Sequence, residues 1–239
     1  INLRAQLIGI NVAVLKEGQG IGFAIPIRQV SEALSERLTP EAMKSLWFGA
    51  RVKAGTLPMT ITAVEPDSPA QKAGLRTGDI ILRVNDKRPR NFLEFSRELV
   101  GTGDQKEVSI EVRSGLDDKK VSVQLVPESK FFNTEMIRKK LGMDVQELTR
   151  ELAESLRFNF YRGFIIVGVD RTGPAADAKL ARGIVIRSID DQTPPDLVAL
   201  ARLLYGKKNG ETVKLNLFIQ LRRGSFIQTQ TALAELIVR

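Results

Sequence analysis

A constant offset of 105 residues relates two stretches of this 239-residue chain without a gap. Ile61 and Val64 fall on Ile166 and Val169, in apolar alternations that are typical of strands. The match continues where SPAQKAGLRTGD (68–79) aligns with GPAADAKLARGI (173–184). Because self-similarity at a fixed spacing marks repeated structural units, we expect two copies of one module.

Each copy has the same expected order: strand, short helix, strand, polar turn, amphipathic helix, strand. In the amphipathic helices, Phe95 and Leu99 are four residues apart, as are Leu200 and Leu204, so each pair shares one helix face. The segments VSIEV (108–112) and VKLNL (213–217) alternate like half-buried strands, and the polar turns RSGLDDKK and RRGS follow them. The pattern predicts a mainly β fold with short helices, of the α+β class.

The chain has no cysteine and no histidine. Without imidazole these residues cannot form a Ser-His-Asp triad or a histidine metal site, and without thiols they cannot form a cysteine zinc site. We therefore expect no cofactor and no bound metal. We also expect no peptide-bond hydrolysis by this chain alone.

The net charge of +8 arises mainly in residues 130–239, which hold 18 basic and 12 acidic residues. The charges are scattered singly and aromatic residues do not alternate with them, a pattern that favours a solvated basic face over nucleic-acid binding. No run approaches the roughly 18 to 20 apolar residues of a membrane span, so we expect no transmembrane segment. No charged-then-apolar leader precedes Ile1, and any targeting peptide is expected upstream or already removed.

The two copies resemble PDZ domains, and specifically the tandem pair that follows the protease domain in HtrA/Deg serine proteases. In the first copy the resemblance rests on Trp47-Phe48-Gly49-Ala50 followed by SPAQKAGLRTGDIILRVND, and in the second on Lys140-Leu141-Gly142-Met143 followed by GPAADAKLARG. The segment ahead of them resembles the end of the family's protease domain, through Leu7-Ile8-Gly9-Ile10-Asn11 and Gly20-Ile21-Gly22-Phe23-Ala24-Ile25-Pro26. The implied division is a trypsin-like protease remnant in 1–46, a first PDZ domain in 47–129 and a second in 130–239.

The resemblance implies two partly open barrels, each with two helices, joined through Pro127 to Met136. The second copy has 12 more residues between its glycine-containing loop and the aligned strand, around LTRELAESLRFNF, and these have helical spacing. In the family, the loop Lys16 to Ile21 borders the protease specificity pocket. For this chain we favour a simple hairpin loop there.

A PDZ domain binds a peptide as an added strand, while backbone N–H groups of a glycine-containing loop hold the peptide's terminal carboxylate. The resemblance assigns these roles in the first domain to Phe48, Gly49 and Ala50 (loop), Val52 (strand), and Phe95 and Leu99 (helix wall). The corresponding residues of the second domain are Leu141, Gly142, Met143, Val145, Leu200 and Leu204. The alternative is that the helix residues are simply core, as a two-residue apolar stripe usually is.

Three positions depart from the family pattern. Where the first copy has Gly74 and Asp79, the second has Lys179 and Ile184. A lysine in a left-handed helix-end conformation costs roughly 1 to 2 kcal/mol unless the turn is rebuilt. Ala5 likewise replaces the glycine expected in a family hairpin of the form NLxG. The second domain is therefore expected to be the less typical one.

Two hypotheses about function remain open. In the first, this is the peptide-binding regulatory region of an HtrA-like protease for protein quality control, which binds hydrophobic C-termini or exposed segments of unfolded proteins. The resemblance then implies a periplasmic or cell-envelope location and a homo-oligomer. In the second, the chain is a non-proteolytic PDZ adaptor or scaffold, and 1–46 is a relic. A GNSGGP motif with a histidine and an aspartate upstream of Ile1 would decide for the protease.

Overall fold

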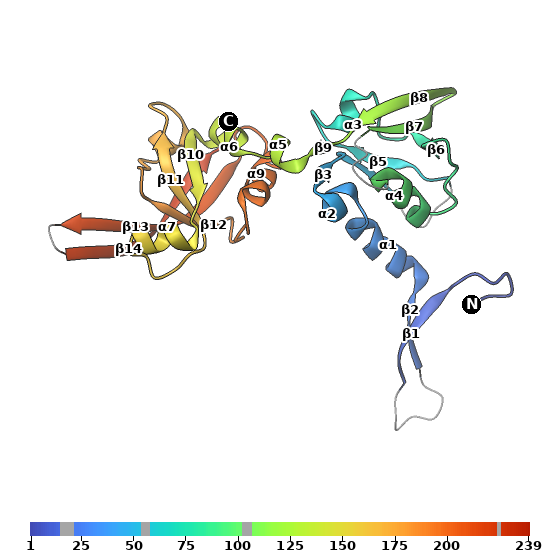
Figure 1. Ribbon diagram of the computed structural model, residues 1–239, viewed down its shortest axis with the longest axis horizontal. Helices are drawn as coiled ribbons and strands as arrows, with labels where there is room; N and C mark the ends of the chain where they lie inside the picture. Colours follow the sequence, from blue (N-terminus) through green and yellow to red (C-terminus); the bar gives the residue numbers. More distant parts are fainter. Residues whose placement is uncertain (15–21, 54–57, 102–106, 224–225) are drawn as a thin grey trace. The chain divides into compact units, whose positions relative to one another are not determined.

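The computed structural model describes residues 1–14, 22–53, 58–101, 107–223 and 226–239, which fall into two compact units, Ile1–Glu128 and Ser129–Arg239 (Figure 1). The first unit contains, in order, β1 (Gly9–Val14), β2 (Gly22–Pro26), α1 (Ile27–Arg37), α2 (Pro40–Lys44), β3 (Leu46–Trp47), β4 (Ala50–Val52), β5 (Ile61–Val64), α3 (Pro69–Lys72), β6 (Ile80–Val84), α4 (Phe92–Val100), β7 (Glu107–Ser114), β8 (Asp117–Gln124) and β9 (Val126–Pro127).

The second unit follows the short helix α5 (Glu128–Phe131). It contains α6 (Thr134–Leu141), β10 (Met143–Glu147), α7 (Arg150–Ser155), β11 (Phe164–Val169), α8 (Pro174–Asp177), β12 (Val185–Ile189), α9 (Leu197–Tyr205), β13 (Thr212–Arg223) and β14 (Phe226–Ile237). The expected mainly β fold with short helices is confirmed. Within the described residues neither unit forms a closed barrel.

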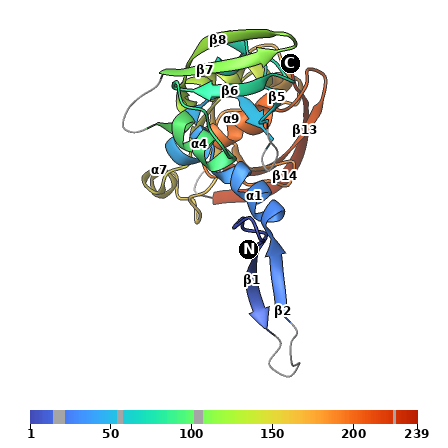
Figure 2. The ribbon, with the colours of Figure 1, turned by 90° about the vertical axis from the view of Figure 1, so that its right-hand side faces the viewer.

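In the first unit β6, β7 and β8 form an antiparallel three-stranded sheet and lie side by side (Figure 2). The pairs β4–β5 and β3–β9 complete the module around one apolar core. The core draws on every part of the repeat pattern: Phe48, Met59, Ile61, Ala70, Leu75, Ile81, Val84, Phe95, Leu99, Val108, Ile110, Val112, Val123 and Leu125 are all buried in it.

The expected turn RSGLDDKK is tighter than the sequence indicates. Ser114 pairs with Asp117, so only Gly115 and Leu116 form the turn, and Asp117 to Lys120 belong to β8. Gly115 has a φ of +64°, the conformation that a two-residue hairpin loop requires.

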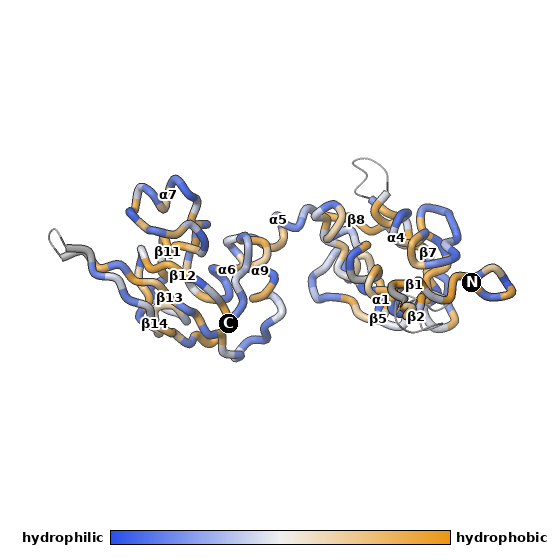
Figure 3. Tube along the Cα trace, turned by 90° about the horizontal axis from the view of Figure 1, so that it is seen from below, coloured by the Kyte–Doolittle hydropathy of each residue, from blue (hydrophilic) through white to orange (hydrophobic). Residues whose placement is uncertain are grey.

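The second unit holds a five-stranded antiparallel sheet in the order β10-β11-β12-β13-β14. Its last two strands are much longer than VKLNL suggests, with twelve residues each. Polar and apolar residues alternate along them, seen as colour changes along the tube (Figure 3). The extra segment of this unit contains α7, which confirms the helical spacing of the insert, and its Ala153 packs with Leu148, Ile165 and Val185.

The polar turns that follow β6 and β12 have the same backbone geometry, as the repeat predicts. Asn85 and Asp86 have φ of +49° and +63°, and Asp190 and Asp191 have +45° and +61°, as a type I′ turn requires at both central positions. The first side chain of each turn accepts a hydrogen bond from the third strand. The N–H of Ser109 lies 3.1 Å from Asn85 Oδ1, and the N–H of Lys214 lies 2.8 Å from Asp190 Oδ1.

Lys179 keeps the left-handed conformation of the glycine it replaces. Its φ is +56°, against +86° for Gly74, and both backbone N–H groups donate to the carbonyl three residues earlier, at 2.9 Å. The turn is therefore not rebuilt around the lysine. Ala5, with a φ of +58°, likewise takes a conformation that favours glycine.

The segment expected to join the two modules, Pro127 to Met136, is not an extended linker. Glu128 begins α5, and the side chain of Asn133 accepts a hydrogen bond from the N–H of Met136, which caps the start of α6.

The described residues of 1–38 form two strands and a helix. β1 pairs with β2, and the N–H of Ile27 at the start of α1 donates to the carbonyl of Ile8. Several apolar side chains of this hairpin are exposed: Leu7, Ile8, Ile10, Val12, Phe23 and Ile25. The loop Lys16 to Ile21 lies outside the described residues. Among the described helices, none is long and apolar enough to cross a membrane.

Candidate functional site

The glycine-containing loop of the first unit is built on a reversal of the chain at Ser45. Thr39 caps the start of α2, and Ser45 ends this helix with a φ of +50°, which turns the chain back into β3. The loop then passes through Phe48 and Gly49, both buried. Gly49 has a φ of +75°, and a Cβ there would lie 2.2 Å from the Cβ of Ser68, so no other residue fits.

The backbone N–H groups of this loop point at a carboxylate. Phe48 N–H donates to Glu41 Oε1 at 2.7 Å, and Gly49 N–H donates to the same oxygen at 3.1 Å. The loop carbonyls bond elsewhere: Ala70 N–H donates to the carbonyl of Phe48, and Glu65 N–H to that of Gly49. Two adjacent N–H donors in such a loop form an anion site, and Glu41 on α2 fills it.

The strand that follows the loop has an open edge within the described part of the chain. β4 pairs with β5 alone, and Lys53 N–H donates across that pair to the carbonyl of Thr60. Because successive N–H groups of a strand point to opposite sides, the N–H of Val52 points to the unpaired side. We call this side the β4 edge. Ala50 and Val52 are partly exposed and pack against the core.

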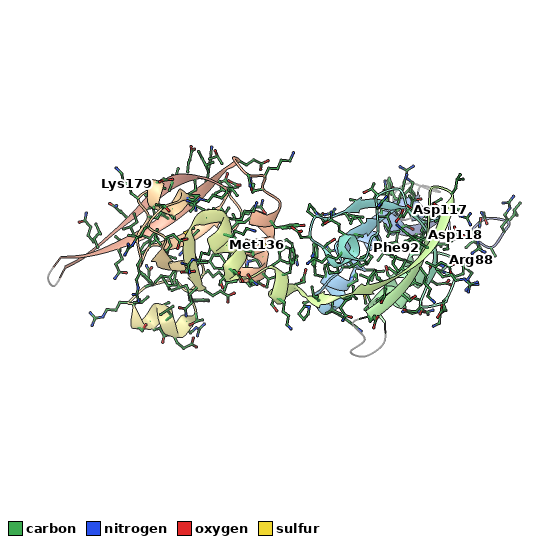
Figure 4. The ribbon with its side chains drawn as sticks, turned by 90° about the horizontal axis from the view of Figure 1, so that it is seen from above. Arg88, Phe92, Asp117, Asp118, Met136 and Lys179 are labelled. Carbon is green, nitrogen blue, oxygen red and sulfur yellow. The ribbon has the colours of Figure 1, made fainter. Side chains whose placement is uncertain are left out.

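The two residues assigned to the helix wall are core residues of the first unit. Phe95 and Leu99 on α4 are 2% and 3% exposed and belong to the same core cluster as Phe48, against which Val52 packs. They therefore present little surface of their own. Phe92, at the start of α4, is partly exposed (Figure 4). Its ring is tilted against that of Phe95, with the ring centroids 5.9 Å apart.

Neither Glu41 nor Phe92 was predicted from the sequence. Phe92 could have been found, because it lies three residues before Phe95 and shares its helix face. Glu41 carries no comparable signal, since its reach depends on the reversal at Ser45.

The corresponding loop of the second unit is a helix end. Gly142 takes a φ of +70° at the C-terminus of α6, and its N–H donates to the carbonyl of Arg138 at 2.7 Å. The flanking residues Leu141 and Met143 are buried. The glycine is therefore where the sequence placed it, but its N–H already has a backbone partner. A Cβ on Gly142 would make only ordinary contacts, the nearest at 3.5 Å from Pro174, whereas a Cβ on Gly49 would clash with Ser68.

The strand after this loop is also less accessible than β4. Val145 is 3% exposed, and Leu200 and Leu204 of α9 are also buried. At the start of α9 the N–H of Leu197 donates to Glu147 Oε1 at 2.7 Å, which ties this helix to the end of β10. All six candidates of the second unit are thus buried residues.

Asp79 is a buried carboxylate in the loop between α3 and β6. Burial by itself would raise its pKa, but hydrogen bonds from Ser114 and from the backbone N–H of Arg76, at 2.9 Å, together with Lys119, lower the pKa below its usual value. The ion pair to Lys119 Nζ is 3.4 Å long. Asp79 stays ionised and fixes this loop. In the second copy Ile184 occupies its place.

No group of three or more acidic side chains in the described ranges could hold a metal ion.

Two models of one family match this chain. A model described as PDZ domain matches residues 60–114, and another with the same description matches residues 139–228. Both matches fall inside the repeats.

Curated relatives match over nearly the whole chain. A probable periplasmic serine endoprotease, DegP-like, from Ectopseudomonas mendocina is 30% identical over 261 residues, which cover 97% of this chain and 53% of that protein. A protein of the same name from Chlamydia trachomatis is 28% identical over 237 residues, covering 90% of this chain and 46% of that protein. The chain thus spans about half the length of these relatives.

Among solved structures, the PDZ domain of HtrA3 bound to a phage-derived ligand (FGRWV) is 25% identical. The match covers 34% of the present chain and 85% of the HtrA3 chain, with a TM-score of 0.31.

Proposed function

This chain carries two PDZ domains and belongs to the HtrA/Deg family, and on this premise we propose that its first domain binds extended polypeptide segments by strand addition at the β4 edge. The observation that carries the proposal is the open β4 edge, which lies beside partly exposed apolar side chains. Among the described strands β4 pairs with β5 alone, so the N–H of Val52 can pair with a peptide backbone, while Ala50, Val52 and Phe92 offer partly exposed apolar surface.

The second domain differs from the first at both features. Its loop N–H at Gly142 is bonded to a backbone carbonyl, that of Arg138, whereas the loop N–H groups of the first domain are bonded to a side chain, and its strand residue Val145 is buried. We therefore assign peptide binding to Phe48, Gly49, Ala50 and Val52, with Phe95 and Leu99 beneath them, and give the second domain's residues a structural role.

For the whole protein we propose a serine endopeptidase of protein quality control, in which this region presents hydrophobic termini or unfolded segments to a protease domain. The relatives are named probable periplasmic serine endoproteases, which supports this activity and a periplasmic location. We further propose that 1–46 belongs to the protease domain and that 47–129 and 130–239 are the PDZ domains. The exposed apolar side chains of β1 and β2 favour a homo-oligomer or a protease partner over solvent.

Strand addition can be tested without altering the protein. An amidated peptide with alternating apolar side chains is titrated into the chain by calorimetry, and two further peptides carry N-methyl groups on alternate backbone amides. We expect a Kd near the micromolar range, about −8 kcal/mol, for the parent peptide. One methylated peptide should lose binding and the other should keep it, because only one set of N–H groups faces β4.

Amide shifts in NMR spectra should move at Ala50 and Val52 and stay in place at Met143 and Val145. If both methylated peptides bind as the parent does, the peptide does not add as a strand and the proposal fails.

A further inference from the structure

Glu41 takes the place that a peptide's terminal carboxylate would occupy. Its Oε1 accepts from two adjacent N–H groups, those of Phe48 and Gly49, at 2.7 and 3.1 Å. A carboxyl terminus and a glutamate side chain end in the same chemical group, so they compete for the same donors. We propose that Glu41 is a built-in competitor that keeps the first PDZ domain closed to free C-termini in its resting state, while the β4 edge remains open to internal segments. This inference rests on the proposed strand addition.

Helix α2, which carries Glu41, is bonded to the rest of the first unit at two places. Lys44, three residues further along α2, donates through Nζ to the carbonyls of Val100 and Gly101 at 3.0 and 3.1 Å, where α4 ends. A cation at the carboxyl end of a helix is favourable, because the carbonyls there lack partners within the helix. Helix α2 therefore bonds the loop through Glu41 and the end of α4 through Lys44.

The competitor is intramolecular, which gives it an advantage over any peptide. Thr39 caps α2 and Ser45 reverses the chain behind it, so Glu41 is presented to the loop without loss of translational freedom. A C-terminal peptide has to displace Glu41 before its carboxylate can bond to Phe48 and Gly49. An internal segment that pairs with Val52 does not use these two donors.

In the second domain, no side chain accepts the hydrogen bond from the glycine N–H of the loop. There Gly142 N–H donates to the carbonyl of Arg138 within α6, and the acid of this helix's first turn, Glu135, is exposed. Both loops have their glycine N–H bonded, but only the first uses a side chain that can rotate away. The first loop is therefore the one that can be opened.

The test compares a peptide that ends in valine with a free carboxylate and the same peptide with an amidated terminus. Both are titrated into the wild-type chain, Glu41→Ala, Glu41→Gln and the control Glu135→Ala, with binding followed by fluorescence anisotropy. In the wild type we expect equal affinities for the two peptides. In both Glu41 variants the free-carboxylate peptide should bind at least about tenfold more tightly, and the amidated peptide should bind as before.

Glu41→Gln keeps the side-chain length, so it separates the loss of charge from any loosening of α2. Thermal unfolding followed by Trp47 fluorescence shows whether each variant is folded, and Glu135→Ala should behave as the wild type in every measurement. Amide signals of Phe48 and Gly49 should shift with the free-carboxylate peptide in the Glu41 variants only.

A wild type that already prefers the free carboxylate tenfold, with no gain in the folded variants, would overturn the role of Glu41 and leave strand addition intact. Variants that gain affinity for both peptides equally would also overturn it, because the competition concerns the carboxylate alone. If no variant binds either peptide, the proposed function itself fails and the inference falls with it.

Discussion

Glycine in place of Lys179 should stabilise the second unit, and alanine in place of Gly74, at the equivalent helix end, should destabilise the first. Lys179 and Gly74 occupy the same left-handed turn, with φ of +56° and +86°. Lys179 is exposed at the surface of its unit (Figure 4), and a Cβ at Gly74 would meet nothing within 4 Å. Neither Lys179→Gly nor Gly74→Ala therefore removes a buried contact, and the backbone alone decides the result.

The magnitude follows from two opposing effects. A non-glycine residue in the left-handed region costs roughly 1 to 2 kcal/mol. Glycine makes the unfolded chain more flexible and so costs about 0.4 to 1 kcal/mol of stability. Lys179→Gly should therefore stabilise the second unit by about 0.5 to 1 kcal/mol, and Gly74→Ala should destabilise the first by the same amount. For a unit of about 110 residues, 1 kcal/mol corresponds to a shift in Tm of about 4 °C.

The chain provides separate probes for the two units. Its single tryptophan, Trp47, lies in the first unit, and both tyrosines, Tyr161 and Tyr205, lie in the second. Urea unfolding followed by tryptophan fluorescence should move for Gly74→Ala and stay in place for Lys179→Gly, while calorimetry resolves the second unit. A lower Tm of the second unit in Lys179→Gly would refute the reasoning, because it would mean that the lysine side chain stabilises the turn more than its backbone strains it.

Three further outcomes are expected. Gly49→Ala should destabilise the first unit by about 2 to 5 kcal/mol in tryptophan-detected urea unfolding, since it adds overpacking against Ser68 to the left-handed strain. The control Gly115→Ala has the same sign of φ but open space around the new Cβ, so it should cost only about 1 kcal/mol of stability, and equal losses in the two variants would contradict this account. Because the pKa of Asp79 is lowered in the folded state, its contribution to stability is complete above about pH 5 and is lost as the pH falls below 4; the urea midpoint of Asp79→Asn should be lower at pH 7 and change less between pH 7 and 3 than that of the wild type, and parallel pH curves would argue against it. Removing residues 1–40 should leave the circular dichroism of both PDZ domains intact and change the mass measured by light scattering, whereas unfolding of the first unit would show that this segment is part of its core.

The repeat alone predicts much of the fold. The repeat places a polar turn at Asn85-Asp86 and another at Asp190-Asp191, and both are type I′ turns with positive φ. The lysine at position 179 was expected to be strained because the aligned residue is glycine, and its φ agrees. Local residue chemistry decides such turns, so the sequence is sufficient there.

The site depends on longer-range geometry and was only partly predictable. The tetrapeptide around Gly142 resembles the one around Gly49, yet it ends a helix that begins at Asn133 and carries Arg138, Lys139 and Lys140 in its last turn. These are start and stop signals of a helix, and they could have been read as such. The contact of Glu41 with the loop could not, because it follows from the left-handed Ser45 and from packing that no local pattern encodes.

The hairpin of β13 and β14 has a consequence for solubility. β14 is the last strand of its sheet, and α8 contacts it. From Phe226 to Ala234 its sequence contains no charge and no proline, and the first charged residue is Glu235. Natural proteins usually protect such strand edges with lysine, proline or a bulge. At high concentration this strand should therefore be where copies of the chain begin to aggregate, and a lysine in place of the exposed Leu233 would be the simplest way to keep them in solution.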